Sequence, residues 1–202
     1  MRTAYIGMGG NLASWAGPPE ATLAAAALRL ESLGHVMHRS SLYSTEPVGF
    51  AAQPRFVNAV VELETELEPR ELLDGLLAIE LEFGRDRASS FPDGPRTLDL
   101  DILVFGNLII KEPGLEVPHP RLAERLFVLV PLGEISLQIF DARSGKTVSQ
   151  LLHSLPQSKQ GTAHDISKMQ SDVWRAGADC GFFGPGAPEL TSRCDVDSDR
   201  RG

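Results

Sequence analysis

The sequence predicts an α+β fold with a ferredoxin-like core, in which helices pack on an antiparallel sheet. Two observations lead to this prediction. Strand-like and helix-like segments follow one another in the order β-α-β-β-α-β over residues 4–105, and each has the apolar spacing of its element type. That order is the split βαβ arrangement, whose helices are expected on one face of the sheet. Because such a fold hosts many activities, the function has to be argued from particular residues.

Glycine and proline delimit the first three elements. Residues 4–8 are an apolar strand that ends at a Gly-Gly-Asn turn signal. A Pro-Pro pair then favours the start of a helix, whose leucines and alanines recur at helical spacing until Gly34 ends it. Residues 36–45 follow as an extended segment, and a loop with Pro47 and Gly49 comes after them.

The next strand has the most regular alternation. Between Phe56 and Leu63 every second residue from Val57 onward is apolar, as in a strand with one face in the core. The same alternation places Phe56 and Asn58 together on the opposite face.

A second helix is predicted from Pro69 to Gly84, with an apolar stripe of leucines and an isoleucine. It precedes strands over residues 97–105 and 108–110. The remaining segments are an apolar run, a hairpin around Ser144-Gly145 and a short last helix, over residues 126–132, 139–148 and 148–155.

Residues 1–156 are expected to form one domain, and residues 157–202 a tail that is mostly disordered. Only six of the 46 tail residues are Ile, Leu, Val or Phe, which is too few to offset the entropy of ordering the segment. The alternative is a docked tail, anchored by Trp174 and the Phe182-Phe183 pair. Removal of residues 157–202 is expected to leave activity intact.

Composition argues against several classes of protein. A net charge of −8 makes a nucleic-acid binder improbable, because neutralised phosphates supply most of that affinity. No apolar run approaches the ~20 residues that span a bilayer, and the N-terminus lacks a secretory signal. Two cysteines, Cys180 and Cys194, make no disulfide framework. We therefore expect a soluble, cytoplasmic protein that binds small molecules and, without an obvious large apolar patch, is a monomer.

The strand over residues 97–102 carries two carboxylates on one face. Its leucines and isoleucine point to the core, so Asp99 and Asp101 share the opposite face, with their Cα atoms ~7 Å apart. Two such carboxylates repel each other unless a cation lies between them, and hard oxygen ligands suit Mg²⁺ shared with substrate phosphates. An exposed strand face that is merely acidic is the alternative.

Cationic residues lie on both sides of this strand in the sequence. The preceding loop carries three arginines, Arg85, Arg87 and Arg96. The guanidinium group binds phosphate bidentately, so these arginines beside paired carboxylates indicate a metal–phosphate site. His119, Arg121 and Arg125 follow downstream. A solvated run of charge is the alternative, and a single surface histidine is more often inert than functional.

Six separate segments resemble, in order, the 6-hydroxymethyl-7,8-dihydropterin pyrophosphokinase family of folate biosynthesis. The resemblance covers roughly residues 3–156. The strongest segments are Gly94–Ile102 and Val117–Leu122, and the others are Gly9–Leu12, Tyr43–Gly49, Phe56–Ala59 and Glu80–Arg85. It implies transfer of diphosphate from ATP to the pterin hydroxymethyl group, with AMP as the other product.

The resemblance also implies roles for individual residues. Asp99 and Asp101 would hold two Mg²⁺ ions on the ATP phosphates, and with Arg85 and Arg96 they form the catalytic group. The nucleotide site would comprise Glu80, Arg87, Arg96, Ile102, His119 and Arg125. The pterin would stack between Phe56 and Phe127, with Asn58 and the backbone from Thr45 to Val48 at its polar edge. Plain core packing of the two phenylalanines is the alternative.

Two other functions use the same residues. One is a nucleotidyl- or kinase-type transferase, which would release pyrophosphate or ADP in place of AMP. The other is a ligand-binding domain without catalysis. In the enzyme, the loops over residues 52–54 and 85–93 are expected to act as lids that exclude water.

Overall fold

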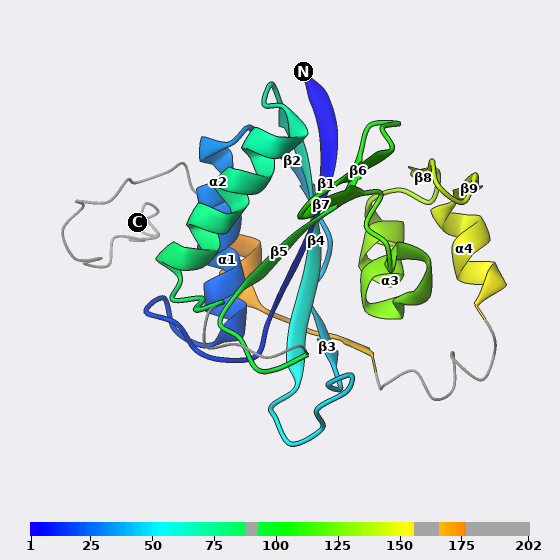
Figure 1. Ribbon diagram of the computed structural model, residues 1–202. Coiled ribbons are helices and arrows are strands. Elements are labelled where there is room, and N and C mark those ends of the chain that lie inside the picture. Colours follow the sequence, from blue (N-terminus) through cyan, green and yellow to red (C-terminus); the bar gives the residue numbers. More distant parts are fainter. Residues whose placement is uncertain (88–92, 156–165, 177–202) are drawn as a thin grey trace, which may run out of the picture.

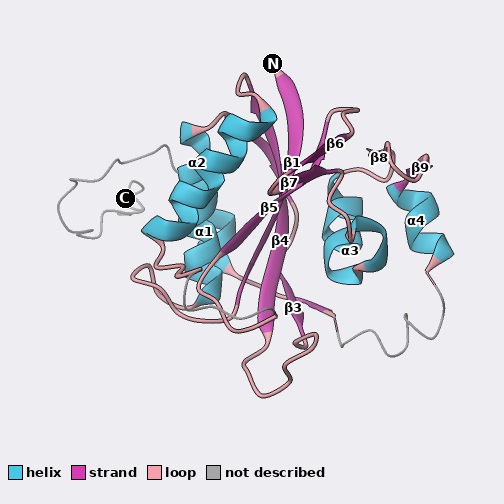
Figure 2. Ribbon diagram, in the orientation of Figure 1, coloured by secondary structure: helices cyan, strands magenta, loops and turns pink. Residues whose placement is uncertain are grey.

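The computed structural model describes residues 1–87, 93–155 and 166–176. Within these residues a six-stranded antiparallel sheet lies between two layers of helices (Figures 1 and 2). Helices α1 (Pro19–Arg29) and α2 (Pro69–Glu82) cover one face. On the other face lies α3 (Leu126–Ile135), with α4 (Val148–Ser154) beside it. The predicted α+β class is confirmed, but the expectation of helices on one face only is wrong.

The sheet has the strand order β10-β3-β4-β1-β5, and β2 also pairs with β4. The strands are β1 (Arg2–Gly10), β2 (His35–Arg39), β3 (Tyr43–Thr45), β4 (Phe56–Thr65), β5 (Asp99–Phe105) and β10 (Ser167–Lys168). The extended segment predicted over residues 36–45 is therefore two short strands. Both lie along β4, with β3 beside its first residues and β2 beside its last.

Smaller elements complete the fold. Strands β6 (Ile110–Glu112) and β7 (Leu115–Val117) form one hairpin, and β8 (Phe140–Asp141) and β9 (Lys146–Thr147) form the predicted one. Three short helices are η1 (Leu30–Ser32), η2 (Leu122–Glu124) and α6 (Asp172–Ala176). None of the helices in the described part of the chain is long and apolar enough to cross a membrane.

Two hydrophobic cores, one on each side of the sheet, explain the alternation in the strands. Val57, Ala59, Val61 and Leu63 of β4 are buried with α1 and α2, as predicted. Val60, which has the opposite orientation, is buried against Leu129 and Leu132 of α3. In β5, Leu100 and Ile102 belong to the first core, so the intervening carboxylates face the α3 side.

The second helix begins and ends as its sequence predicts. Glu68, just before the helix, and Glu71 in its first turn form a capping box, and Pro69 occupies the first helical turn, where its missing N–H costs nothing. Gly84, just beyond the helix, has a φ of +80°, a conformation that glycine adopts without steric cost. The chain can therefore turn sharply into the arginine-bearing loop.

Part of the predicted tail is docked, which corrects the expectation of disorder for residues 166–176. Strand β10 pairs with β3, and Trp174 is 6% exposed within the first core. The indole Nε1–H donates a hydrogen bond of 2.8 Å to the Ser40 carbonyl oxygen. The alternative with Trp174 as an anchor is thus correct for this segment, whereas the Phe182-Phe183 pair lies outside the described residues. A single large aromatic side chain gives this segment the buried surface that its average composition lacks.

The end of β1 is held close to the chain that leads into β5. The backbone N–H groups of Asn11 and Leu12 both donate to the Arg96 carbonyl oxygen, at 2.9 and 3.0 Å. A Cβ on Gly10 would lie 2.3 Å from the Thr97 carbonyl oxygen. Only glycine allows this approach of two backbones.

We expect Gly10→Ala to lower the free energy of unfolding by roughly 2–3 kcal/mol, because backbone must move to admit the methyl group. Gly133→Ala in α3 is the control, since its Cβ would meet only the ends of leucine and valine side chains, the nearest at 3.3 Å. Alanine also favours the helix, so the control should change stability by less than about 1 kcal/mol. Urea denaturation measures both, and equal losses would contradict the account.

Candidate active site

Asp99 and Asp101 lie two residues apart on β5, on the face away from the first core. The cavity that they line also includes Arg96, Arg125 and Phe127. Burial and then the neighbouring Asp99 carboxylate raise the pKa of Asp101 to about 6. The predicted carboxylate pair is therefore present, in surroundings that disfavour two negative charges without a cation.

Three arginines surround Asp99, as their positions in the sequence predict. The Arg96 Nε atom lies 3.1 Å from one carboxylate oxygen. The Nη2 atoms of Arg85 and Arg87 lie 3.5 and 4.0 Å from the other. The last two residues follow α2, whereas Arg96 precedes β5, so the contact between α2 and β5 brings them together.

Several of these guanidinium groups have buried atoms without a hydrogen-bond partner. In the described part of the chain they are Arg85 Nε and Nη1 and, on the neighbouring Arg125, Nε. Arg96 Nε also makes no hydrogen bond, but it is ion-paired with Asp99. Buried N–H donors are nearly always paired in folded proteins, so unpaired ones around a cavity favour an anionic ligand. Phosphate oxygens accept charge-assisted hydrogen bonds from this kind of donor.

Glu80 holds Arg87, one of the three arginines near Asp99, in position. Its side chain is 1% exposed and accepts hydrogen bonds of 2.8 Å from Arg87 Nε and Nη2 and from the Leu100 backbone N–H. Burial raises the pKa of Glu80, although these donors act in the opposite direction. The Glu80 carboxylate thus orients Arg87 and also links α2 to β5.

His119 lies next to the arginine cluster as a neutral imidazole. Its backbone N–H donates to the Leu103 carbonyl oxygen at 2.8 Å, and its Nδ1 accepts from the Arg121 N–H at 3.1 Å. Burial, followed by the charges of Arg125 and Arg121, lowers its pKa to about 4. With Nδ1 as acceptor, the proton is on Nε2, which is left to act as a donor.

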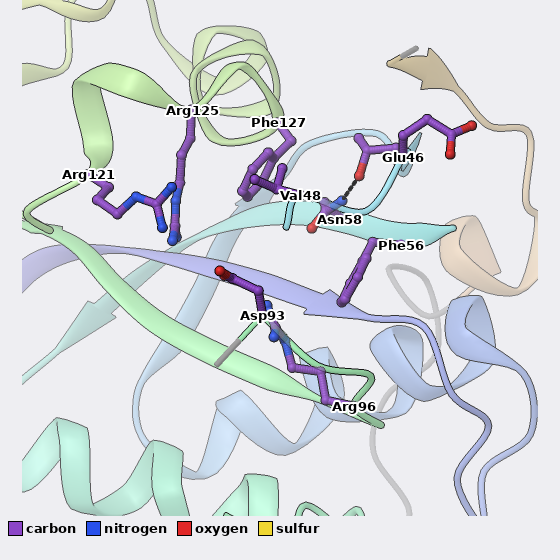
Figure 3. Close-up of a pocket in the computed structure, with 10 residues that line it drawn as sticks. Glu46, Val48, Phe56, Asn58, Asp93, Arg96, Arg121, Arg125 and Phe127 are labelled. Atoms are coloured by element: carbon purple, nitrogen blue, oxygen red, sulfur yellow. Dashed lines mark hydrogen bonds between the residues drawn. The ribbon is translucent and has the colours of Figure 1, made fainter. Parts of the chain in front are cut away.

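A second cavity contains every residue that the resemblance assigns to the pterin. Thr45, Val48, Phe56, Asn58 and Phe127 all line it, together with Arg96, Arg121 and Arg125 (Figure 3). In this view Asn58 lies between the two phenylalanines, and its Nδ2 donates to Thr45 Oγ1 at 2.8 Å. Phe56 and Phe127 therefore face a cavity, and each ring has an arginine over it, at 4.8 and 5.4 Å.

This second cavity is small. Its volume is about 40 Å³, whereas sites for small organic ligands usually have ~300–1,000 Å³. A cyclic ligand therefore requires outward movement of the chain around it. Outward displacement of the loop after β3 would cost little buried surface, because Glu46 and Gly49 are exposed.

Asn11, for which the sequence predicts no individual role in the site, also lies in this region. It is 4% exposed. Its Nδ2 donates to Gln53 Oε1 and the Pro54 carbonyl oxygen, both at 3.0 Å, and its Oδ1 accepts from the Arg96 N–H at 2.8 Å. Gln53 in turn donates to the Asp93 carbonyl oxygen at 2.8 Å. Asn11 thus joins the two loops that were predicted as lids, although residues 88–92 of the second lie outside the described residues.

One predicted site residue is separated from the others. The Ile102 side chain is 4% exposed in the first core, on the face of β5 away from the two carboxylates. A ligand at the carboxylates could contact Ile102 only through its backbone. The strand alternation that places the two carboxylates on one face also excludes this side chain from that face.

Comparison with known proteins identifies the family. The model of the 7,8-dihydro-6-hydroxymethylpterin-pyrophosphokinase (HPPK) family matches residues 5–137. The chain belongs to this family. It is 44% identical to the 2-amino-4-hydroxy-6-hydroxymethyldihydropteridine pyrophosphokinase of Pseudomonas aeruginosa over 156 residues, which cover 75% of this chain and 91% of the relative. For the Bacillus subtilis pyrophosphokinase the identity is 46% over 138 residues, covering 67% and 79%.

Solved structures of HPPK proteins have the same fold. Wild-type Plasmodium falciparum HPPK-DHPS superposes with a TM-score of 0.62 at 15% identity, over 80% of this chain and 46% of that one. The chain therefore spans less than half of that larger protein. As a member of the HPPK family, the chain is an enzyme, an ATP-dependent diphosphotransferase.

We expect His119 to reduce stability as the pH falls from 6.5 towards 4. In that range the unfolded chain binds a proton at this imidazole and the folded chain does not, so acidification favours unfolding. His119→Asn retains an acceptor for the Arg121 N–H but cannot titrate. Urea denaturation at several pH values should give a smaller decline for the variant, and identical declines would contradict the lowered pKa of His119.

Proposed function

We propose that the protein transfers the terminal diphosphate of ATP, as one unit, to the hydroxymethyl oxygen of 6-hydroxymethyl-7,8-dihydropterin in folate biosynthesis, releasing AMP. One observation carries this proposal: the cavity with Phe56 and Phe127 adjoins the cavity with Asp99 and Asp101. Four residues line both cavities, namely Asn58, Arg96, Arg125 and Phe127. A flat ring between Phe56 and Phe127 would direct a substituent towards phosphates bound near Asp99 and Asp101.

The carboxylate pair suits Mg²⁺, and we include two Mg²⁺ ions in the proposal. No group of three or more His, Cys, Asp or Glu that could hold a metal occurs among the described residues. Mg²⁺ does not require one, because it commonly takes one or two protein carboxylates and completes its octahedron with phosphate oxygens and water. Held by Asp99 and Asp101, Mg²⁺ would neutralise phosphate charge and increase the electrophilicity of the β-phosphorus.

The chain's own residues would orient the pterin. Phe56 and Phe127 offer two aromatic faces to a heterocycle, and stacking adds ~0.5–1.5 kcal/mol beyond the buried area. Asn58 Nδ2 is already bonded to Thr45, so its Oδ1 is the atom placed to accept an N–H of the ring. Backbone N–H and C=O groups near Val48 would form hydrogen bonds with the rest of the polar edge of the pterin.

The cationic residues would bind ATP and stabilise charge on the departing AMP. Transfer of this kind depends mostly on positioning and on neutralised charge, so it needs no strong base. Arg85 and Arg125 have unpaired N–H donors, Arg96 is ion-paired with Asp99, and Glu80 holds Arg87 in place. Neutral His119 would add one uncharged donor through Nε2. The hydroxymethyl oxygen would form a bond to the β-phosphorus as the bond between that phosphorus and the oxygen leaving with AMP breaks, and the hydroxyl proton would pass to water.

For its setting, we propose a monomer that acts in the cytoplasm on these two small-molecule substrates. The two cysteines and the net charge of −8 support this setting.

The reaction is tested by its products. With ATP, Mg²⁺ and the pterin, we expect AMP that forms only when the pterin is present. ADP would indicate transfer of a single phosphoryl group, and pyrophosphate would indicate a nucleotidyltransferase. Asp99→Ala should fold normally and lose roughly 10²–10³-fold in turnover, because its interactions serve the charge that changes in the reaction. Asp74→Ala, at an exposed position on α2, is the matched control, and wild-type turnover by Asp99→Ala would contradict the metal assignment.

The stacking role has a separate test. Phe127→Leu keeps most of the apolar volume but removes one aromatic face, so we expect the KM for the pterin to rise up to about tenfold. The KM for ATP should stay within about twofold, which distinguishes stacking from general damage to the site. Phe140→Leu changes an exposed phenylalanine on β8 and serves as the control. An unchanged pterin KM in Phe127→Leu would favour plain packing of that ring.

A further inference from the structure

The docked segment of residues 166–176, called the C-terminal strap below, extends the sheet beside the pterin cavity. Ser167 and Lys168 pair with Ser44 and Tyr43 of β3, and the Met169 N–H donates to the Leu42 carbonyl oxygen at 2.8 Å. In Figure 1 the strap is the orange segment. It lies beyond residues 5–137, which the family model matches.

Strand β3 is short and carries part of the cavity. It has only three residues, and the last of them is Thr45, which holds the Asn58 amide. The pairing of Tyr43 with Asn58 and of Thr45 with Phe56 places β3 beside the part of β4 that lines the cavity. Because β3 makes so few hydrogen bonds to β4, its position depends on the segment that pairs with its outer edge.

Trp174 fixes the chain that leads into β3. The indole is buried, bonds to the Ser40 carbonyl oxygen at 2.8 Å, and lies 5.5 Å below the Arg39 guanidinium. The carbonyl group that accepts this hydrogen bond lies at the bend between β2 and β3. Removal of the indole would leave both a cavity in the first core and an unpaired carbonyl group.

Lys168 connects this edge to the opposite wall of the pterin cavity. Its Nζ lies 2.6 Å from Oε1 of Glu134, whose Oε2 accepts from the Ser41 N–H at 2.7 Å. Glu134 belongs to α3, the helix that carries Phe127. The strap therefore joins the strand that holds Thr45 to the helix that holds the stacking ring.

We propose that the C-terminal strap is a positioning element for the pterin half of the active site, with Trp174 and Lys168 as its positioning residues. The proposal rests on the proposed function, since it concerns the affinity for the pterin. It acts through β3 and α3 and touches neither substrate, so its loss should weaken pterin binding while the phosphate site keeps its geometry. It also reverses the expectation that residues 157–202 are dispensable.

The test compares two truncations of the full chain. The chain ending at residue 176 keeps the strap and should match the full chain. The chain ending at residue 156 should show a pterin KM raised by about tenfold or more, because small displacements in a binding site have large effects. Its KM for ATP should be little changed. Equal pterin KM values for the two truncations would overturn the proposal.

Point variants remain informative if the shorter chain does not fold. Trp174→Ala should raise the pterin KM more than it lowers kcat, and Trp174→Phe, which refills the core, should restore part of the loss. Lys168→Ala alters a half-exposed side chain and should raise the pterin KM by about two- to fivefold. Lys146→Ala on β9 is its control. Equal losses for both substrates would mean that the strap only stabilises the fold.

Calorimetric titration of the pterin, in the absence of ATP, separates this proposal from the proposed function. If the full chain binds the pterin but forms no AMP, the proposed reaction fails, while weaker binding by Trp174→Ala still supports the strap. If the full chain forms AMP and Trp174→Ala binds the pterin normally, the strap alone fails. A full chain that neither binds the pterin nor forms AMP overturns both.

Discussion

The side-chain alternation of β5 is the constraint on which the rest of the site depends. Leu100 and Ile102 are buried against α1 and α2, so Asp99 and Asp101 have to face the α3 side of the sheet. A shift of one residue in the register of β5 would bury both carboxylates in an apolar core. The hydrophobic free energy that stabilises the fold therefore also fixes the orientation of the two acids.

Electrostatic imbalance follows from that placement. Burial, and after it repulsion by the Asp99 carboxylate, raises the pKa of Asp101, while nearby guanidinium groups have unpaired N–H donors. Such an arrangement leaves both signs of charge incompletely compensated, and a complex of divalent cations with a polyphosphate compensates both. The adjoining cavity, lined by Phe56 and Phe127, then determines which acceptor meets the phosphates.

Local sequence predicted those parts of the site that depend on adjacent residues. The carboxylate pair, the arginines near it and the common face of Phe56 and Asn58 follow from spacing along single elements. Helix α3 could not be assigned, because it is apolar around most of its circumference and contains Pro131. Asn11 was missed because its partners lie 42 to 85 residues away. Docking of residues 166–176 depends on one indole and its acceptor, which average composition does not show.

The central claim is that one cavity holds the pterin against phosphates bound at Asp99 and Asp101. A crystal structure of the full chain with Mg²⁺, the pterin and an ATP analogue with a methylene bridge between its α- and β-phosphates would test it most directly. The account predicts Mg²⁺ on oxygens of both aspartates, the pterin between Phe56 and Phe127, and its hydroxymethyl oxygen facing the β-phosphorus. Mg²⁺ bound elsewhere, or a pterin outside that pair of rings, would contradict it.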